Sequence, residues 1–386
     1  MSEFRTIREL CSVVVDCPHS TPKWTANGKI VIRNKNIKHG KIDFSSPSYT
    51  DDEHFAQRIK RAKPQPGDII ITREAPIGDV GMIPKNTECC LGQRMVLLRA
   101  NQSVCDNFYL LYSLQSLYVQ HQISWSEGTG TTVSNLRIPH LEQIQIPYLP
   151  LEQQAKISSV LRALEEKIEN NRRLNDNLQQ QAAALFSSLY DRTNTEVRFT
   201  DLIQILGGGT PKTGENTYWN GNIAFFTPKD VGTPYTLITE KTITEEGLSH
   251  CNSRLYPVNT VFVTARGTVG KVGMSGVPMA MNQSCYALVG KETHQLLVYF
   301  YALKAVDRLK HKASGAVFDA ITTRDFESEQ IMKLSDDDAK AFLCIAEPMF
   351  QKVLNNCIEN LRLSTLRDSL LPKLMSGEVD VSAVQL

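Results

Sequence analysis

The chain has 386 residues of ordinary globular composition, which is room for two or three domains that each bury a core. Its first residues, MSEFRTIREL, lack the apolar core of a signal peptide, and no apolar run is long enough to span a membrane, so we expect a cytoplasmic protein. A net charge of +1 and nine cysteines without a CxxC pair argue against a wholly basic nucleic-acid-binding face, a disulfide framework and a structural metal.

A mixed domain over residues 1–149 is the first predicted element. Short strand-like runs alternate with loops rich in Gly, Pro, Thr and Asn, without the strand–helix alternation of a doubly wound sheet. Residues 67–81, GDIIITREAPIGDVG, predict a strand over 69–72, a polar turn and a second strand. This pattern is typical of an α+β domain with a partly irregular sheet.

Residues 150–190 predict one long helix that shares a seam with another helix. The stretch has no glycine, has no proline after its first residue, and is rich in strong helix formers. Its apolar and amide positions alternate steps of four and three, as in a coiled coil: Ile157, Leu161, Leu164, Ile168, Asn171, Asn175, Leu178, Ala182, Leu185 and Leu189.

The rest of the chain repeats this plan, with a second domain over 191–335, a second long helix over 336–376 and a tail over 377–386. Residues 259–273, NTVFVTARGTVGKVG, match 67–81, with a strand over 261–264. Further matches pair 20–23 with 209–212, 28–32 with 221–225, 130–146 with 315–331, and Gln93 with Gln283. Pro372 is expected to kink or end the last helix, which closes over 376–378.

The repeat provides the first long helix with a partner inside the same chain. In an antiparallel pair whose facing residue numbers sum to 531, Asn171 faces Asn360 and Asn175 faces Asn356. A slipped register would leave buried amides without hydrogen bonds, at roughly 1–3 kcal/mol for each group. Alternatively, these asparagines lie on wet faces of two helices that never meet. About 40 helical residues would hold two domains roughly 50–60 Å apart.

The predicted fold class is therefore α+β: two similar mixed domains, joined by two long helices that pack as an antiparallel coiled coil, with a pseudo-twofold internal repeat. Catalytic patterns are missing. GTVGKVG departs from a P-loop at Val272, and the sequence contains neither a GxGxxG that opens a helix after a strand nor a GxSxG elbow. We expect no catalysis, no cofactor and no metal site in this chain.

Duplicated binding groups remain. Flexible loops with Thr, Lys and Arg suit phosphates, whereas the bidentate reach of Gln and Arg suits base edges in a major groove. Ordinary loop residues with solvated charges are the alternative for each of them. The phosphate candidates are Thr21, Lys23, Arg33, Lys35, Thr210, Lys212, Thr227 and Lys229. The base-reading candidates are Arg73, Gln93, Arg266 and Gln283, and Thr72 and Arg324 complete the DNA-binding set.

The order and duplication of these segments resemble the specificity subunit of type I restriction-modification systems over essentially the whole chain. The resemblance rests on GGGTPKT…YWNGNI, on ITREAPIGDVG and VTARGTVGKVG, on PLEQQAKISSVLRALEEKIENNRRLNDNL, and on TLRDSLLPKLMSGEV. It implies two target recognition domains that each read one half of a split sequence in double-stranded DNA. Residues 16–23, DCPHSTPK, depart from the family's glycine-rich loop and put the phosphate contacts of the first domain in doubt.

The resemblance also implies partner subunits. Modification subunits would dock on the helices and methylate adenine with S-adenosylmethionine, and restriction subunits would translocate and cut DNA with ATP and Mg. The competing interpretation is a non-catalytic coiled-coil adaptor that displays two peptide- or ligand-binding domains and binds no DNA. The near-neutral charge slightly favours the adaptor, and the duplicated Gln and Arg positions disfavour it.

Overall fold

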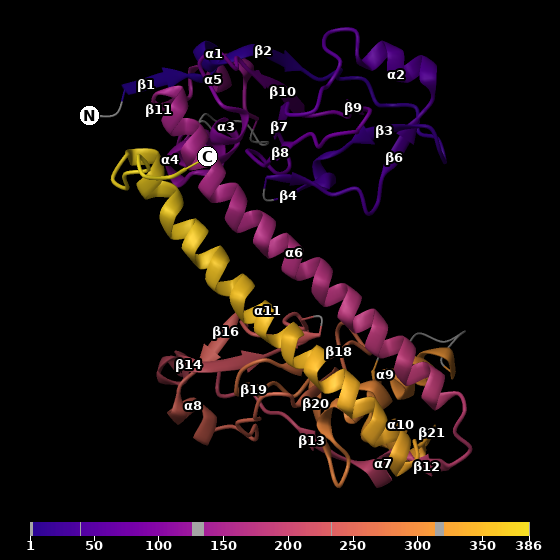
Figure 1. Ribbon diagram of the computed structural model, residues 1–386. Coiled ribbons are helices and arrows are strands. Elements are labelled where there is room, and N and C mark those ends of the chain that lie inside the picture. Colours follow the sequence, from indigo (N-terminus) through magenta and orange to yellow (C-terminus); the bar gives the residue numbers. More distant parts are fainter. Residues whose placement is uncertain (1–2, 39, 126–134, 233, 313–319, 386) are drawn as a thin grey trace. The chain divides into compact units, whose positions relative to one another are not determined.

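The computed structural model describes residues 3–38, 40–125, 135–232, 234–312 and 320–385, which fall into two compact units. One unit comprises Met1–Glu166 with Leu363–Leu386, and the other comprises Lys167–Arg362. Each unit therefore contains a mixed domain and the adjoining parts of two long helices (Figure 1). Of the repeated segments at 130–146 and 315–331, residues 130–134 and 315–319 lie outside the described residues.

A four-stranded antiparallel sheet, in the order β2-β10-β7-β8, is the centre of the first unit. Its strands are β2 (Cys11–Asp16), β7 (Ile69–Thr72), β8 (Val80–Met82) and β10 (Met95–Ala100). Ile69 and Ile71 face a core shared with helix α3 (Asn107–Gln115), whereas Ile70 faces a second core on the other side of the sheet. Because both faces are covered, β7 is a continuous apolar run without polar alternation.

Smaller elements complete this unit. A second sheet, in the order β6-β3-β9, contains a parallel β3–β9 pair. Core residues of the C-terminal segment, Leu374, Met375 and Val381, pack with those of the first domain. The remaining elements are β1 (Glu3–Thr6), α1 (Ile7–Leu10), β3 (Lys29–Ile32), β4 (Ile37–Lys38), β5 (Lys41–Ile42), β6 (Ser48–Thr50), α2 (Asp52–Arg58), β9 (Cys89–Leu91), α4 (Leu117–Trp125), α5 (Ile138–Gln143) and β11 (Gln145–Tyr148).

The second unit repeats this plan, which confirms the internal repeat. Its main sheet has the order β13-β20-β17-β18-β15, and a second sheet, β16-β14-β19, contains a parallel β14–β19 pair. Val261 and Val263 face one core, and Phe262 faces another. The elements are β12 (Glu196–Arg198), α7 (Phe199–Leu202), β13 (Ile203–Gly207), β14 (Trp219–Phe226), β15 (Tyr235–Thr236), β16 (Lys241–Ile243), α8 (Glu245–Ser249), β17 (Val261–Thr264), β18 (Val272–Ser275), β19 (Met279–Met281), β20 (Cys285–Gly290), α9 (Gln295–Lys312), α10 (Thr323–Ser328) and β21 (Gln330–Met332).

The duplicated sequence motif forms the same strand–turn–strand element in both units, as predicted. The amide of Gly78 donates to the carbonyl oxygen of Thr72, and that of Gly270 to the carbonyl oxygen of Thr264, each at 2.9 Å. Gly78 has φ +81° and Gly270 has φ +74°. The turn needs this left-handed conformation, which explains a glycine at the same place in both copies.

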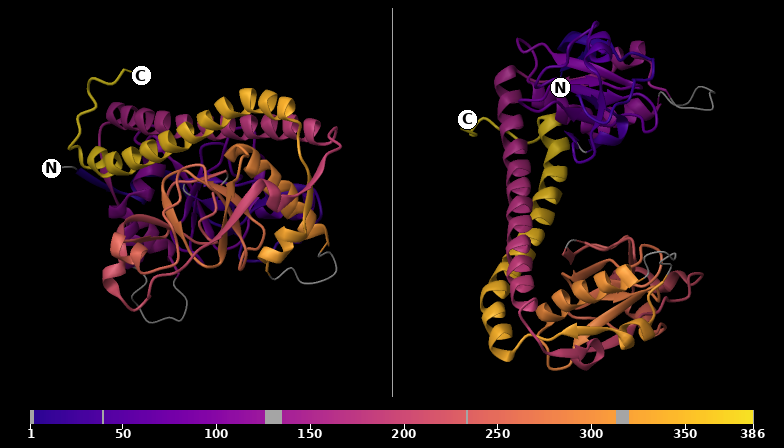
Figure 2. Two further views of the ribbon diagram at one scale, coloured as in Figure 1. Left: turned by 90° about the horizontal axis from the view of Figure 1, so that it is seen from below. Right: turned by 90° about the vertical axis from the view of Figure 1, so that its right-hand side faces the viewer.

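Two long helices, α6 (Leu151–Tyr190) and α11 (Asp336–Ser376), pack side by side within each unit (Figure 2). Asn171 Nδ2 donates to Asn360 Oδ1 at 2.9 Å, and Asn356 Nδ2 donates to Asn175 Oδ1 at 2.7 Å. Both pairs fit the predicted antiparallel register, so the alternative of two helices that never meet is wrong. In the first unit, Arg367 Nη1 lies 3.5 Å from Glu165 Oε1 on the facing helix.

The end of α11 differs from the expectation for Pro372. The helix continues through this residue to Ser376, and Gly377 follows with φ +75°. A left-handed glycine is a common helix terminator, whereas a proline near the end of a helix removes only one backbone donor. None of the helices in the described ranges combines the length and apolarity that crossing a bilayer requires.

Candidate nucleic-acid interface

Four loops leave the same end of the sheets in the first domain. In the main sheet, Asp16 pairs with Val96 and Met95 pairs with Thr72, so β2 and β7 end where β10 begins. In the second sheet, Ile32 pairs with Leu91 in parallel, so β3 and β9 end together. The segments that follow these strand ends are 17–23, 33–35, 73–79 and 92–94, which we call the first loop cluster.

The second domain forms the equivalent second loop cluster from residues 208–212, 227–229, 265–271 and 282–284. Corresponding hydrogen bonds join its segments. Gly92 N donates to Ile32 O at 2.8 Å, and Asn282 N donates to Phe226 O at 3.0 Å. Asn34 Nδ2 reaches Glu74 O at 2.6 Å, whereas Thr268 Oγ1 reaches Pro228 O at 3.1 Å. The repeat therefore brings predicted site residues together at one end of each domain.

Both loop clusters concentrate positive charge, although the net charge of the chain is only +1. Cations outnumber acids in the first cluster, and the second contains no acidic residue. The first carries Lys23, Arg33, Lys35, Arg73 and Arg94 against Glu74 and Asp79, and the second carries Lys212, Lys229, Arg266 and Lys271. A local excess of this kind suits a polyanion such as DNA.

A glutamine lies at the same place in each loop cluster. It contacts the loop that contains the TPK motif, which is residues 21–23 in the first cluster and 210–212 in the second. Gln93 Nε2 donates to the carbonyl oxygen of His19, and Thr210 Oγ1 donates to Gln283 Oε1. Gln93 is half-buried and Gln283 is exposed. In both domains, a side chain that can pair with a base edge is thus held beside a loop with donors suited to phosphate.

Two of the predicted DNA contacts are corrected by the structure. Thr72 is fully buried, and its Oγ1 accepts the amide of Asp79 at 2.9 Å, so it cannot reach a ligand. The side chain of Arg73 is only 12% exposed, and its Nη1 contacts both carboxylate oxygens of Asp16, at 2.9 and 2.8 Å. Arg73 Nε also donates to Leu136 O at 2.9 Å. Arg73 therefore holds the base of the first loop cluster together and is not free to read a base.

Most of the other candidates are accessible. Lys23 is exposed and pairs with the half-buried Asp51 at 3.3 Å, and Lys229 is exposed and pairs with the exposed Glu240 at 3.6 Å. The hydroxyl of Thr227 donates to Asp230 at 2.6 Å. The exposed candidates are Thr21, Lys23, Arg33, Lys35, Lys212, Lys229, Arg266, Gln283 and Arg324, and Gln93, Thr210 and Thr227 are intermediate. Arg324 lies outside the loop clusters, on α10.

Sequence reasoning missed two exposed residues of this region. Trp24, next to the first loop cluster, is 44% exposed, and the guanidinium of Arg33 lies 5.0 Å from the centre of its ring. Arg94 has φ +65° and makes a 3.2 Å ion pair with Glu74. A tryptophan directly after the TPK motif and an arginine directly after Gln93 were the available signals.

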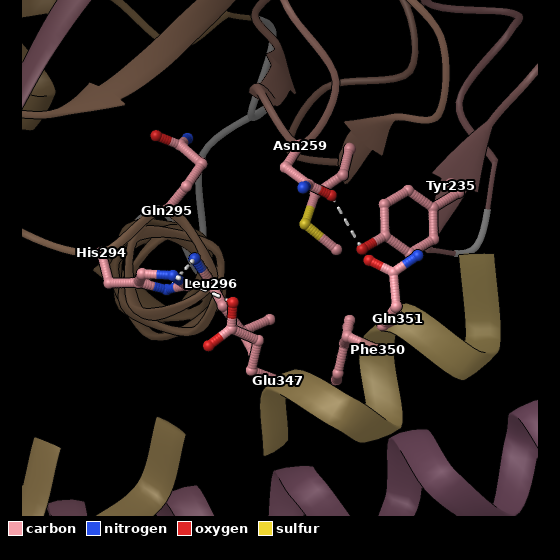
Figure 3. Close-up of a pocket in the computed structure, with 9 residues that line it drawn as sticks. Tyr235, Asn259, His294, Gln295, Leu296, Glu347, Phe350 and Gln351 are labelled. Atoms are coloured by element: carbon pink, nitrogen blue, oxygen red, sulfur yellow. Dashed lines mark hydrogen bonds and ion pairs between the residues drawn. The ribbon is translucent and has the colours of Figure 1, made fainter. Parts of the chain in front are cut away.

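Two hollows of the second unit lie away from its loop cluster. A cavity of about 100 Å³ separates the start of α9 from α11, and in it Tyr235 OH donates to Asn259 Oδ1 at 3.0 Å (Figure 3). A groove of about 870 Å³ is lined by side chains from 197–202, 291–301 and 333–343, at the opposite end of the main sheet from the second loop cluster. Its walls mix lysines with acids, which does not suit a polyanion. Among the residues that the structure describes, no three His, Cys, Asp or Glu side chains are grouped as metal ligands.

Comparisons with known proteins identify the family of the chain. A family model described as the type I restriction modification DNA specificity domain matches residues 3–180 and 192–333. The type I restriction enzyme MjaIX specificity subunit of Methanocaldococcus jannaschii is 23% identical over 341 residues, which cover 82% of this chain and 78% of that protein. The putative MjaX specificity subunit of the same organism is 20% identical over 414 residues, covering 98% and 94% of the two chains.

A solved structure extends the likeness to the fold. The type I restriction-modification S subunit from M. genitalium superposes with a TM-score of 0.62 at 18% identity, covering 97% of this chain and 96% of that one. The family model spans both domains and most of the intervening helix. The chain therefore belongs to the family of type I restriction-modification specificity subunits, and it is the DNA specificity subunit, a non-catalytic component, of such a system.

Proposed function

We propose that the chain reads a bipartite target in double-stranded DNA, with one half-site bound by each loop cluster. The observation that carries this proposal is the duplication of the cluster itself. Four equivalent segments, the same backbone hydrogen bonds and a glutamine at the same place recur in both domains. Two similar readers in one chain are the arrangement that a split sequence requires.

Within each loop cluster, we assign the accessible cations to phosphates and the glutamines to base edges. Lys23, Arg33, Lys212 and Lys229 are exposed and suit the backbone, which fixes position without reading sequence. Gln93, Gln283 and Arg266 suit base edges. The hydroxyls of Thr21, Thr210 and Thr227 and the cations of Lys35 and Arg324 would add further contacts.

The two helices would act as the spacer between the readers. In this proposal the target recognition domains are residues 1–149 and 191–335, the spacer helices are 150–190 and 336–376, and residues 377–386 form a tail. A helix of 40 residues is about 60 Å long at 1.5 Å per residue. Half-site spacing follows from the separation of two binding modules, and their linkage raises the effective concentration of the second contact.

Partner subunits would supply the chemistry. The chain belongs to a family defined by type I restriction-modification systems, so we propose that modification subunits dock on its helices and methylate adenine with S-adenosylmethionine. Restriction subunits that use ATP and Mg would complete a cleaving complex. The chain itself would hold no cofactor and would act in the cytoplasm. The family assignment favours this role over an adaptor that binds no DNA.

Selection from a duplex library tests the proposal. The full-length chain, co-purified with its methyltransferase partner, would be mixed with duplexes that contain a randomised central region, and the bound duplexes sequenced. We expect two short conserved segments separated by a gap of constant length and variable sequence. A single contiguous motif, or no sequence preference, would reject a bipartite reader.

A matched pair of substitutions in the second loop cluster separates the two kinds of contact. Gln283→Ala should lower affinity for the selected duplex by about 1–3 kcal/mol and leave affinity for random DNA unchanged, because only base readout is lost. Lys212→Ala should weaken binding to both duplexes and reduce the slope of log affinity against log salt by about 0.9, because one phosphate contact is lost. Titrations at several salt concentrations measure both effects. Equal losses on the two duplexes for Gln283→Ala would contradict its assignment.

A further inference from the structure

Arg58, the last residue of α2, is a buried arginine that joins two segments of the first loop cluster. It is 6% exposed. Its Nε donates to Leu91 O at 2.7 Å and its Nη2 to Gly92 O at 2.9 Å, at the turn that leads to Gln93. Its Nη1 donates to Ser20 O at 3.0 Å and its Nη2 to Pro18 O at 3.2 Å, in the loop that leads to the TPK motif.

The guanidinium is held by carbonyl oxygens alone. Among the described residues, no carboxylate lies within ion-pair distance of Arg58. Burial lowers its pKa, yet a guanidinium stays protonated in proteins because its ordinary pKa is so high. A buried charge must be satisfied by hydrogen bonds, so the four carbonyl oxygens have to stay directed at one planar group. Arg58 therefore fixes the geometry of both segments at once.

In the second loop cluster, the two corresponding segments are held together without an arginine. Gly209 N donates directly to Met281 O at 3.1 Å. A Cβ atom at Gly208 would lie 2.2 Å from Asn282 O and 2.5 Å from Met281 O, so only glycine allows this approach. In the second domain, the backbones of the two loops therefore contact each other directly. The first domain has Cys17–Ser20 in place of these glycines, and the Arg58 side chain bridges its loop to the turn.

We propose that Arg58 is a positioning residue of the first loop cluster, which sets the placement of Gln93 relative to the loop 17–23 without touching DNA itself. This inference rests on the proposed DNA-reading function. It predicts that a defect at Arg58 affects only the half-site that the first domain reads, because the second domain anchors its loop through glycines.

The Arg58→Lys variant keeps the charge but loses the planar fork that spans four carbonyl oxygens. The unaltered chain first selects its preferred duplex from the randomised library. Scrambling one half-site of that duplex at a time then measures discrimination at each half-site separately. Arg58→Lys should lose discrimination at one half-site by about tenfold or more and keep it at the other. Arg61→Lys, an exposed arginine three residues further along the chain, is the matched control and should change neither half-site.

Hydrogen exchange on the full-length chain without DNA gives a second, independent readout. Amide exchange in residues 17–23 and 92–94 should rise in Arg58→Lys and stay unchanged in residues 208–212 and 282–284. Unchanged exchange in the first cluster, or equal loss of discrimination at both half-sites, overturns the proposal. If the unaltered chain selects no bipartite sequence, the proposed function fails, and the exchange measurement still decides whether Arg58 positions the loops.

Discussion

Replacing Arg73 with alanine should lower the free energy of unfolding of the first domain by about 3–5 kcal/mol. The guanidinium and the Asp16 carboxylate are each only 12% exposed, and Nη1 contacts both carboxylate oxygens. Removing Arg73 would leave the Asp16 carboxylate with the exposed His19 ring, 2.9 Å away, as its remaining ion-pair partner. Urea unfolding, monitored with a probe in the first domain, measures this loss of unfolding free energy.

Arg94 provides the control for this experiment. It lies in the same loop cluster and makes an ion pair with Glu74 at 3.2 Å, but its side chain is 58% exposed. An exposed pair contributes only about 0–1 kcal/mol, so Arg94→Ala should hardly change unfolding. If Arg73→Ala were equally mild and weakened binding to the selected duplex alone, Arg73 would be a base-reading residue after all.

Replacing Asn175 with leucine should destabilise the helix pair by about 1–3 kcal/mol. Asn356 is 1% exposed, and its Nδ2 donates to Asn175 Oδ1 at 2.7 Å. Leucine would leave that amide without its partner inside the interface. The double variant Asn175→Leu with Asn356→Leu should recover most of the loss, because two apolar side chains then face each other.

A double-mutant cycle on the free energy of unfolding measures this coupling. Asn355→Leu is the matched control. Asn355 is exposed and lies next to Asn356 on α11, so its replacement should have little effect. Strictly additive losses in the double variant would mean that the two asparagines do not depend on each other. The fixed register of the helices would then need another explanation.

The helices, their register and the repeat were predictable because each depends on local sequence. A stretch without helix breakers forms α6, and its repeat forms α11 despite Pro348 and Pro372. Two asparagines in each helix define one antiparallel alignment. The matching strand–turn–strand motifs needed the same glycine for the same left-handed turn. In such cases the physical requirement lies within a few residues, so the sequence displays it.

The site was predictable only in part, because burial depends on tertiary packing. The sequence located loops with suitable donors but did not show that Thr72 faces inward or that Arg73 meets Asp16. Arg58 gave no signal either, since an arginine on a short polar helix is usually solvated. Its role depends on carbonyl oxygens from segments 33–40 residues away.

The distribution of charge resolves an apparent conflict. A net charge of +1 gives no reason to expect DNA binding, yet the loop clusters hold an excess of cations at one end of each domain. Acids elsewhere balance them, on exposed faces of the helices among other places. Net charge alone is therefore a poor guide to a protein whose proposed DNA contacts are confined to a few loops.

Shortening both helices together tests the central claim most directly. Deleting residues 167–173 and the facing residues 358–364 keeps the antiparallel pairing and the Asn175–Asn356 layer, and it removes about 10 Å from each helix. The randomised-duplex selection would then be repeated with the shortened chain. If the helices hold two DNA-reading domains apart, the selected duplexes should contain the same two half-site sequences with a changed gap between them. An unchanged gap would contradict the role of the helices as a spacer.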